Sequence, residues 1–421
     1  MRALALIDGE HYAPVVRDAL REIPHEFEGA LLVGGTEKLV GGDDYGLPVV
    51  TDFDEAVERF EPQVAVDISD EPVLGPRERF LLASRFLARG VAYEGADFVL
   101  RVPRYEPFEL PSVAVIGTGK RLGKTAVTGY AARLLAADRE LVVVSMGRGG
   151  PAEPQTADLR PTPEDLLQLA RAGEHAASDY LETAALAGVP TIGCRRAGGG
   201  LAGVPWTSNV AAGARAAVGR EPDLVLFDGS GAAIPPVATG RRILVTSAHQ
   251  PAELVTGYLN AYRILVSDLV VLTMAEEGTP HAELAAAIRE VEELRVVPVV
   301  LRPRPVEPVE GERVAFFTTA EESAAESLER HLREDHGPSE VTVSCNLSRR
   351  EELRRDVEGA DADVFLVEIK AAAIDVVCEA AAERGVRVVF ADNDVVPVDG
   401  SSALDEELQA LADLTQPEPV A

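Results

Sequence analysis

The sequence predicts an α/β protein whose core is a mostly parallel β-sheet, flanked by an N-terminal and a small C-terminal α/β domain. Short apolar runs alternate with helical patterns over nearly the whole chain, and this alternation is typical of parallel sheets covered by helices. Proline-rich stretches at residues 103–111 and 302–311 interrupt the alternation twice. We therefore expect three domains, at 1–105, 106–305 and 306–421, of which the first is Rossmann-like.

The N-terminal domain begins with a strand that leads into a polar loop. Its strands are expected at 3–7, 30–33 and 64–68, and its helices at 13–21, 54–60 and 78–89. Asp8-Gly-Glu10-His11 follows the first strand, and titratable groups beside a glycine at a strand end suit a binding loop. We expect Glu10 and His11 to bind substrate, with a purely structural histidine as the alternative. Gly34-Gly-Thr-Glu-Lys38 is a weaker site of the same kind.

The central domain carries the longest series of apolar runs. Its strands are expected at 113–116, 141–145, 191–194, 224–227, 243–246, 269–273 and 297–301, and its helices at 163–172, 178–187, 252–264 and 281–293. Ligands of open parallel sheets bind beyond the carboxyl ends of the strands. Polar residues that follow these strands are therefore the first candidates for function.

A glycine-rich turn, Gly117–Thr125, lies between the first of these strands and a helical pattern. In this arrangement backbone N–H groups and a helix N-terminus cradle phosphates. Lys124 is expected on the β- and γ-phosphates and the Thr125 hydroxyl on Mg²⁺. Thr118 stands where the usual pattern has glycine, and the loop resembles that of dethiobiotin-synthetase-like P-loop proteins. We therefore expect a core of the P-loop NTPase type. The expected ATP-binding residues are Gly117, Thr118, Gly119, Lys120, Arg121, Leu122, Gly123, Lys124, Thr125 and Ala126.

A second strand end can complete the magnesium site. Residues 224–228 form an apolar run that ends in Asp228, and an aspartate there can hold Mg²⁺ beside Thr125, as a Walker-B acid does. We assign Asp228 as catalytic and metal-binding. The alternative is an aspartate that caps the following turn.

Two further strand ends combine arginine with glycine. Glycine allows close approach of the backbone to a ligand, and a guanidinium group grips phosphate through two hydrogen bonds. The expected substrate-binding residues at these ends are Arg148, Gly149, Arg195, Arg196 and Gly199. Neighbouring arginines in an extended segment point to opposite sides, so only one of the pair need face the ligand. Arg148 and Lys120 are also assigned as catalytic, beside Lys124.

The C-terminal domain is smaller and ends in an acidic tail. Its strands are expected at 314–318, 341–345, 364–369 and 388–391, its helices at 320–333, 349–357 and 371–384, and a fraying surface helix after Ser402. Only four of the 40 basic side chains are lysines: Lys38, Lys120, Lys124 and Lys370. An arginine-rich chain keeps lysine chiefly where a compact ammonium is needed. We therefore treat Lys370 as a substrate contact and Lys38 as a site candidate, with ordinary surface lysines as the alternative.

The net charge of −30 argues against nonspecific binding to nucleic acid or to an anionic membrane. No apolar run approaches the roughly 20 residues that span a bilayer. The three cysteines show no CxxC spacing, which disfavours a zinc site and fits a reducing cytoplasm. An anionic substrate would need a locally basic site in this acidic protein.

Taken together, these segments resemble the cyclic 2,3-diphosphoglycerate synthetase family. The resemblance extends from Asp8 to about Asp399, and the residues that carry it are Ile7–Tyr12, Gly117–Thr125, Met146–Pro151, Gly193–Gly200 and Glu368–Asp375. It implies ATP- and Mg²⁺-dependent formation of an intramolecular phosphoanhydride from 2,3-diphosphoglycerate, with release of ADP and phosphate. It also implies a homodimer.

Two other functions remain open from the residues alone. One is a dethiobiotin-synthetase-like ligase or kinase acting on a carboxylate or carbamate, although the arginine–glycine loops favour a phosphorylated substrate. The other is a P-loop nucleotide switch. A GTP switch would need an Asn/Thr-Lys-x-Asp element, and no lysine lies between Lys124 and Lys370.

Overall fold

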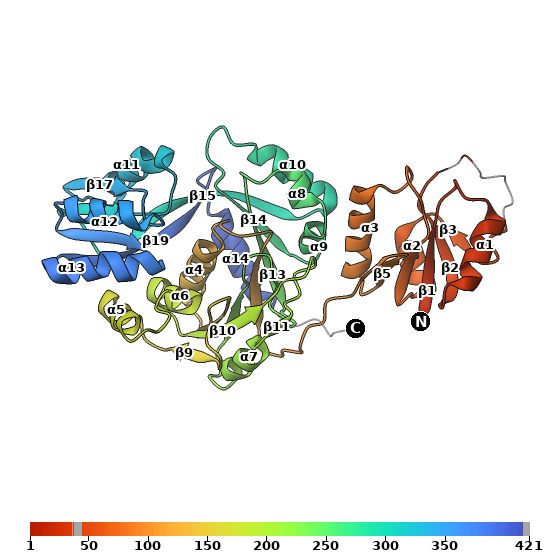
Figure 1. The fold of residues 1–421 in the computed structure, drawn as a ribbon, viewed down its shortest axis with the longest axis horizontal. Helices are drawn as coiled ribbons and strands as arrows, with labels where there is room; N and C mark the ends of the chain where they lie inside the picture. The colour runs from red at the N-terminus through yellow and green to blue at the C-terminus, as the bar shows by residue number, and fades with distance from the viewer. Residues whose placement is uncertain (36, 38–43, 416–421) are drawn as a thin grey trace. The chain divides into compact units, whose positions relative to one another are not determined.

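The computed structural model describes residues 1–35, 37 and 44–415 and divides into two compact units. Unit 1 comprises residues 1–104, 251–266 and 286–293, and unit 2 comprises 105–250, 267–285 and 294–421. Figure 1 shows the strands and helices of each unit. Among the described residues, none of the helices combines the length and the apolar composition needed to span a bilayer.

Unit 1 is built on a six-stranded sheet in the order β3-β2-β1-β4-β5-β6, parallel except for the final pair. Its strands are β1 (Arg2–Ile7), β2 (Glu26–Leu32), β3 (Val49–Val50), β4 (Val64–Asp67), β5 (Ala92–Gly95) and β6 (Phe98–Leu100). Its N-terminal helices are α1 (Ala13–Glu22), α2 (Phe53–Phe60) and α3 (Pro76–Ala88). Five of the six β1 residues are buried, because β1 lies in the interior of the sheet. The predicted strands and helices of this part are all present.

The prediction of a single helix at 252–264 is wrong. The segment forms α8 (Ala252–Thr256) and α9 (Asn260–Leu265), separated by Gly257 and by Tyr258, which has a φ of +49°. A left-handed backbone conformation cannot continue a right-handed helix. Both helices belong to unit 1, where the rings of Tyr258 and Phe80 on α3 lie 5.7 Å apart.

Unit 2 holds a second sheet with the order β11-β10-β8-β12-β7-β13-β14-β15-β19-β18-β16-β17, and β9 pairs with β10. Strands β10, β8, β12, β7, β13, β14 and β15 are mutually parallel, so their carboxyl ends lie at one edge. The strands of this half are β7 (Ser112–Gly117), β8 (Leu141–Gly147), β9 (Gln155–Ala157), β10 (Thr191–Ala197), β11 (Thr207–Ser208), β12 (Leu224–Asp228), β13 (Arg241–Ser247), β14 (Leu269–Thr273) and β15 (Arg295–Pro305). The helices are α4 (Lys124–Leu135), α5 (Pro163–Arg171), α6 (Asp179–Ala187), α7 (Val210–Val218) and the first residues of α10 (His281–Val291), whose residues 286–291 belong to unit 1.

The proline-rich stretch predicted as a domain boundary is a strand over its first residues. β15 continues to Pro305 and pairs antiparallel with β19 (Arg387–Pro397), which joins the C-terminal part to the same sheet. Proline is tolerated there because β14 pairs only as far as Pro298, so the prolines beyond it need no partner on that side. The register places the carboxyl end of β18 (Val364–Glu368) beside Ala391, which pairs with Pro305.

The C-terminal part completes the fold with a short parallel set, β16 (Arg313–Phe317), β17 (Glu340–Ser344), β18 and β19. Its helices are η1 (Glu322–Ala324), α11 (Ala325–His336), α12 (Arg350–Gly359), η2 (Ala373–Cys378), α13 (Glu379–Arg384) and α14 (Ala403–Asp413). The helix predicted at 371–384 begins with the wider π-type turns of η2. The predicted α/β class with mostly parallel sheets is confirmed.

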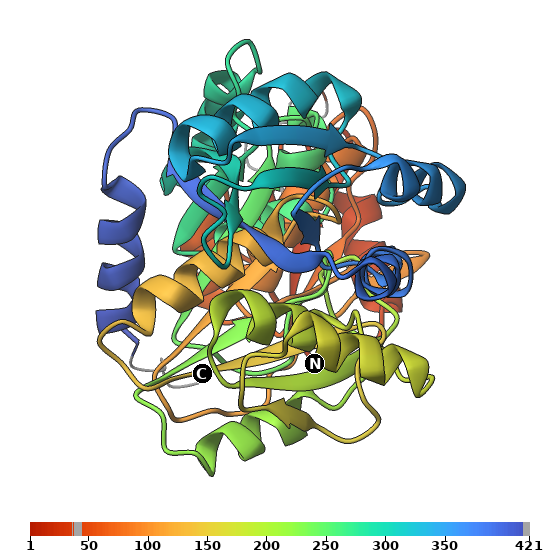
Figure 2. The ribbon, with the colours of Figure 1, turned by 90° about the vertical axis from the view of Figure 1, so that its left-hand side faces the viewer.

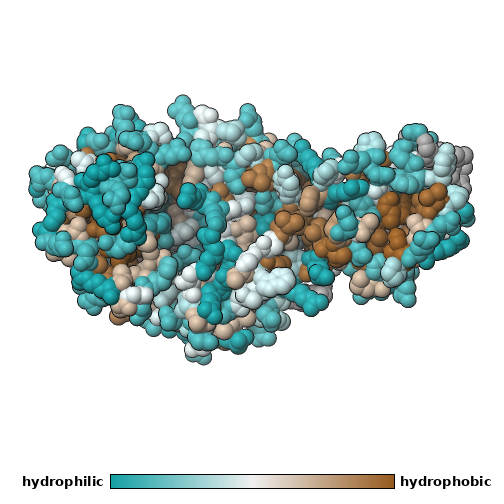
Figure 3. Space-filling model, in the orientation of Figure 1, coloured by the Kyte–Doolittle hydropathy of each residue, from teal (hydrophilic) through white to brown (hydrophobic). Residues whose placement is uncertain are grey.

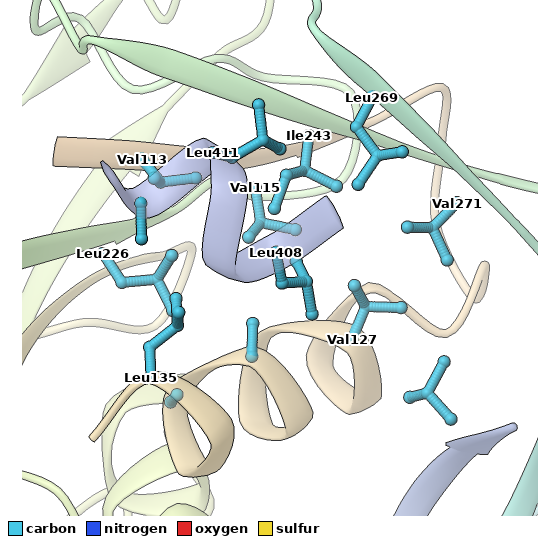
Figure 4. Close-up of a cluster of buried hydrophobic side chains, with 14 of the residues drawn as sticks. Val113, Val115, Val127, Leu135, Leu226, Ile243, Leu269, Val271, Leu408 and Leu411 are labelled. Atoms are coloured by element: carbon cyan, nitrogen blue, oxygen red, sulfur yellow. The ribbon is translucent and has the colours of Figure 1, made fainter. Parts of the chain in front are cut away.

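The helix predicted to fray after Ser402 is instead part of the main core. In α14, Leu404 and Leu408 are at most 1% exposed and pack with Val113 and Val127. Figure 4 shows Leu408 and Leu411 above α4, and Figure 2 shows α14 (deep blue) alongside α4 (gold). The prediction missed this because the acidic residues of α14 mask its apolar stripe, which repeats every three to four residues.

Candidate active site

The glycine-rich turn forms a loop between β7 and α4, held at both ends. The backbone N–H of Thr118 donates to the carbonyl of Val245 (3.2 Å), and the Thr273 hydroxyl donates to the carbonyl of Leu122 (2.6 Å). Gly123, with a φ of +77°, starts α4, and a Cβ there would lie 2.7 Å from Leu301 Cδ1. The N-terminus of α4 therefore opens directly from the loop, as a phosphate cradle requires.

The structure explains why Thr118 can replace the usual glycine. Its side chain is almost fully buried, and its hydroxyl lies 2.6 Å from Gln250 Oε1 and 3.1 Å from Thr246 Oγ1. The side chain is thus bound to β13 and the turn after it. Gln250 and Thr246 were not foreseen, because no sequence motif marks them.

Lys124 and Asp228 meet in the middle of this site. Lys124 Nζ donates to Asp228 Oδ1, and the Thr128 hydroxyl, one turn along α4, donates to the same oxygen at 2.9 Å. Asp228 is 2% exposed. Burial raises the pKa of Asp228, and the contacts with Lys124 oppose that shift. In this structure Lys124 therefore neutralises the acid that was predicted to bind metal.

The donor set nevertheless fits Mg²⁺. Thr125 stands next to Lys124 at the start of α4, and its hydroxyl together with the Asp228 carboxylate supplies the hard oxygen ligands that this ion prefers. Binding of Mg²⁺ to Asp228 would require Lys124 to leave that carboxylate. An ATP phosphate is the partner expected to draw Lys124 away.

The two arginines near the carboxyl end of β10, Arg195 and Arg196, have different roles. Arg196 donates from Nη1 to the carbonyl of Gly198 (2.5 Å) and from Nη2 to that of Ser230 (2.8 Å). Burial, together with the nearby charge of Arg148, lowers the pKa of Arg196. Arg195 is exposed, and its backbone N–H donates to Asn209 Oδ1. Arg196 therefore fastens the turn after β12, while the Arg195 side chain is open to a ligand.

That turn lies against the phosphate loop. A Cβ on Gly117 would lie 3.1 Å from the carbonyl of Gly231, and a Cβ on Gly231 would lie 3.4 Å from Lys120 Cγ. The Ser230–Gly231 turn thus packs between Arg196 and the loop residues Gly117 and Lys120. Glycine is needed at these positions because the backbones approach so closely.

The loop after β8 carries Arg148 into the same region. A Cβ on Gly150 would overlap the carbonyl of Cys194 on β10, and one on Gly149 would lie 3.2 Å from His175 Nε2. A Cβ on Gly147 would lie 3.0 Å from the carboxylate of Asp179, the first residue of α6. Gly199 lies in the loop after β10, where a Cβ would be 3.6 Å from Arg196 Nη1.

Lys370 reaches this region from the C-terminal part. It follows β18, and its Nζ lies 2.9 Å from Glu182 Oε1 on α6. Asp179 lies three residues before Glu182 on the same helix. Unit 2 therefore brings six basic side chains together near α4 and α6: Lys120, Lys124, Arg148, Arg195, Arg196 and Lys370. Asp179, Glu182 and Thr128 were missed, because within the sequence they are ordinary residues of amphipathic helices.

Glu10 and His11 lie in unit 1, after β1. His11 Nδ1 is 2.7 Å from Asp8 Oδ1, and the same oxygen accepts from the backbone N–H groups of Glu10 and His11. Burial opposes ionisation of Asp8, but these bonds and one from the N–H of Asp70 lower its pKa. His11 thus has one ring nitrogen held and the other available. Lys38 lies outside the described residues.

The chain matches three family models that together cover most of its length. They are the N-terminal domain of cyclic 2,3-diphosphoglycerate synthetase at 2–101, its P-loop domain at 112–300 and its C-terminal domain at 305–394. The chain belongs to the cyclic 2,3-diphosphoglycerate synthetase family. The resemblance, the P-loop type of the core and the enzyme class predicted from the sequence are thereby confirmed.

Similar proteins with the name cyclic 2,3-diphosphoglycerate synthetase align over nearly the full chain. The protein of Rubrobacter xylanophilus is 52% identical over 98% of this chain and 97% of its own. That of Thermococcus gammatolerans is 42% identical and that of Methanothermus fervidus 40%, each over 95% of this chain and 94% of its own.

Among solved structures, LpxK from Aquifex aeolicus in complex with ATP covers 73% of this chain and 90% of its own. Its sequence identity to this chain is 12% and its TM-score is 0.39. This similarity is too low to support a conclusion about the candidate active site.

Proposed function

We propose that this protein synthesises cyclic 2,3-diphosphoglycerate from 2,3-diphosphoglycerate and ATP, with Mg²⁺, and releases ADP and phosphate. The observation that carries the proposal is the gathering of lysines and arginines around the phosphate loop of unit 2, in a chain of net charge −30. Family membership supplies the substrate, because the relatives named above are synthetases of this product.

The basic site answers the main electrostatic difficulty of the reaction. Two phosphates that must be joined repel each other, by about 4 kcal/mol for each pair of unit charges at ~4 Å and an effective dielectric constant of about 20. Guanidinium and ammonium groups held at fixed positions offset this repulsion without reorganising. Arg148, Arg195 and Lys370 are the side chains we assign to the substrate phosphates.

The remaining residues divide between ATP and the loops around it. We assign the backbone of Gly117–Ala126 to the ATP phosphates, and Lys120 and Lys124 to the phosphoryl group that is transferred. Mg²⁺, held by Thr125 and Asp228, would neutralise charge on the same phosphates. Gly149 and Gly199 permit close approach of substrate, and Arg196 supports the Ser230 turn. Glu10 and His11, which lie in unit 1, stay predicted as substrate-binding residues of that unit.

The chemistry proceeds in two displacements. An oxygen of one substrate phosphate attacks the γ-phosphorus of ATP, the bond to the β–γ bridging oxygen breaks, and ADP leaves. An oxygen of the second substrate phosphate then attacks the phosphorus atom of the first substrate phosphate, which now carries the transferred γ-phosphoryl group. A new P–O–P bond closes the ring, and the former γ-phosphate leaves as inorganic phosphate.

Isotope transfer tests this order of events. With ATP labelled by ¹⁸O on its γ-phosphate, the label is expected in the released phosphate and not in the cyclic product. Absence of the label from the phosphate would exclude the scheme. Incubation without 2,3-diphosphoglycerate serves as the control. If the rate of ATP hydrolysis is the same with and without this compound, the protein is a nucleotide switch instead.

Three features of organisation belong to the same proposal. The domain limits at 1–105, 106–305 and 306–421 are supported by the ranges of the three family models. We propose a homodimer, which light scattering of the purified protein can test. We also propose a cytoplasmic location, with which the three free cysteines agree.

A further inference from the structure

Lys370 and Glu182 form an ion pair that joins two halves of unit 2. Glu182 lies on α6, in the half that carries the phosphate loop, and its side chain is 12% exposed. Lys370 follows β18, in the C-terminal half, and its side chain is half-exposed. A nearly buried carboxylate therefore holds the ammonium group of a side chain that is itself 46% exposed.

The other carboxylates near Lys370 are engaged elsewhere or lie further away. Glu368 accepts hydrogen bonds from the Thr318 hydroxyl and from the N–H and hydroxyl of Thr319, which fix it to the loop after β16. Among the described residues, Glu182 is the one carboxylate within ion-pair distance of the Lys370 ammonium. Burial alone would lower the pKa of Lys370, but the charges of Glu182 and Glu368 exceed that effect and raise it.

We propose that Glu182 is a positioning residue that holds the Lys370 ammonium in place for a substrate phosphate. This inference rests on the proposed function, because it takes Lys370 as a substrate contact. A free lysine side chain loses rotamer entropy when a ligand fixes it. Lys370 has already lost part of that freedom, because its Nζ is bound 2.9 Å from Glu182 Oε1.

The small number of lysines allows a direct test. With four lysines in the chain, reaction with an amine-selective acetylating reagent can be followed residue by residue by mass spectrometry. The variant is Glu182→Gln, which keeps the size of the side chain but removes its charge. The control variant is Glu379→Gln, which removes the charge from another ion pair between the same two halves, Arg171–Glu379, on the exposed surface.

In Glu182→Gln, acetylation of Lys370 is expected to accelerate several-fold. Loss of the carboxylate frees the amine from its ion pair and lowers its pKa, so a larger fraction is in the neutral, reactive form. Lys120, which makes no contact with Glu182, should react at its wild-type rate. The KM for 2,3-diphosphoglycerate should rise about tenfold, while the KM for ATP and the melting temperature stay unchanged. Glu379→Gln should match wild type in all five measurements.

The outcomes separate the two proposals. An unchanged rate of Lys370 acetylation, or an unchanged KM for 2,3-diphosphoglycerate, would overturn the positioning role while wild type still makes the cyclic product. Equal rises in both KM values together with a lower melting temperature would also overturn it, because they would show a structural role only. Failure of the wild-type protein to form the product at all would instead defeat the proposed function.

Discussion

At the scale of single residues, the pair of Lys124 and Asp228 links stability to activity. Both side chains are nearly buried, and each neutralises the other. Such a pair contributes little net stability, but removing one partner leaves an uncompensated buried charge. Lys124, which we assign to the ATP phosphates, is therefore also needed to neutralise the buried Asp228.

Lys124→Ala should abolish turnover and also lower the free energy of unfolding by about 3 kcal/mol. Burial already raises the pKa of Asp228, and loss of Lys124 raises it further. An acid with a raised pKa in the folded state destabilises the fold above that pKa, so the deficit should shrink as the pH falls. Urea unfolding at pH 8 and at pH 5 measures it.

The double variant Lys124→Ala with Asp228→Asn is the matched control, because it removes the charge that was left unpaired. It should recover most of the lost stability and remain inactive. A Lys124→Ala protein as stable as wild type at both pH values would contradict this account.

Substitutions of the two arginines of β10, Arg195 and Arg196, should have different effects. Arg195→Ala is expected to raise the KM for 2,3-diphosphoglycerate and leave the melting temperature unchanged, because its side chain is exposed. Arg196→Ala breaks the bonds to the carbonyls of Gly198 and Ser230 and should cost about 1–3 kcal/mol in stability. Urea unfolding and steady-state kinetics of both variants test this. Equal losses of stability in the two would refute the division.

At the scale of elements, α14 shows how an acidic segment can be part of a core. Its leucines fall on one face and complete the cluster between α4 and the sheet (Figure 4). Tyr130 on α4 also donates from its hydroxyl to Asp405 Oδ1 at 2.6 Å. The helix that starts at the phosphate loop is thus supported along its length by the end of the chain.

Leu408→Ala should lower the free energy of unfolding by about 2–5 kcal/mol, because it opens a cavity at a site 1% exposed. Leu414→Ala is the matched control: it removes the same atoms at a position 58% exposed and should change stability by less than about 0.5 kcal/mol. Urea unfolding of the two variants provides the comparison. Similar values for both would place α14 outside the core.

At the scale of the whole molecule, charge and ligand binding act together. The face drawn in Figure 3 is mostly hydrophilic, as expected for a chain in which 26% of residues are charged. A protein of net charge −30 repels an anionic nucleotide at long range, and the basic residues of unit 2 offset this repulsion locally.

MgATP at about 100 times its Kd should stabilise unit 2 by about 2.7 kcal/mol. Hydrogen exchange measures this stabilisation. Exchange should slow in peptides from β7, α4 and β12, where the phosphates and the metal are expected. Addition of EDTA should remove most of the protection, because without Mg²⁺ the ion pair between Lys124 and Asp228 persists and opposes binding of the ATP phosphates. Equal protection by ATP with and without Mg²⁺ would speak against the metal site.

Much of the fold and part of the site could be predicted from the sequence alone. Gly117, Arg195 and Asp228 lie at or near the ends of β7, β10 and β12, and Arg148 follows β8 directly. These strands were predicted correctly because each is a short apolar run that can be recognised locally. The alternation of strands and helices determined the α/β class for the same reason: it depends on neighbouring residues only.

Only the tertiary structure decided which residues meet. The partners Lys124 and Asp228 are 104 residues apart, and Lys370 and Glu182 are 188 apart, so no local pattern could pair them. The division of Arg195 from Arg196, the burial of α14 and the continuation of β15 to Pro305 likewise depend on neighbours from distant parts of the chain. Sequence determines what a segment can become, whereas packing and long-range pairing determine what it contacts, because those free energies arise only once the sheet has brought the segments together.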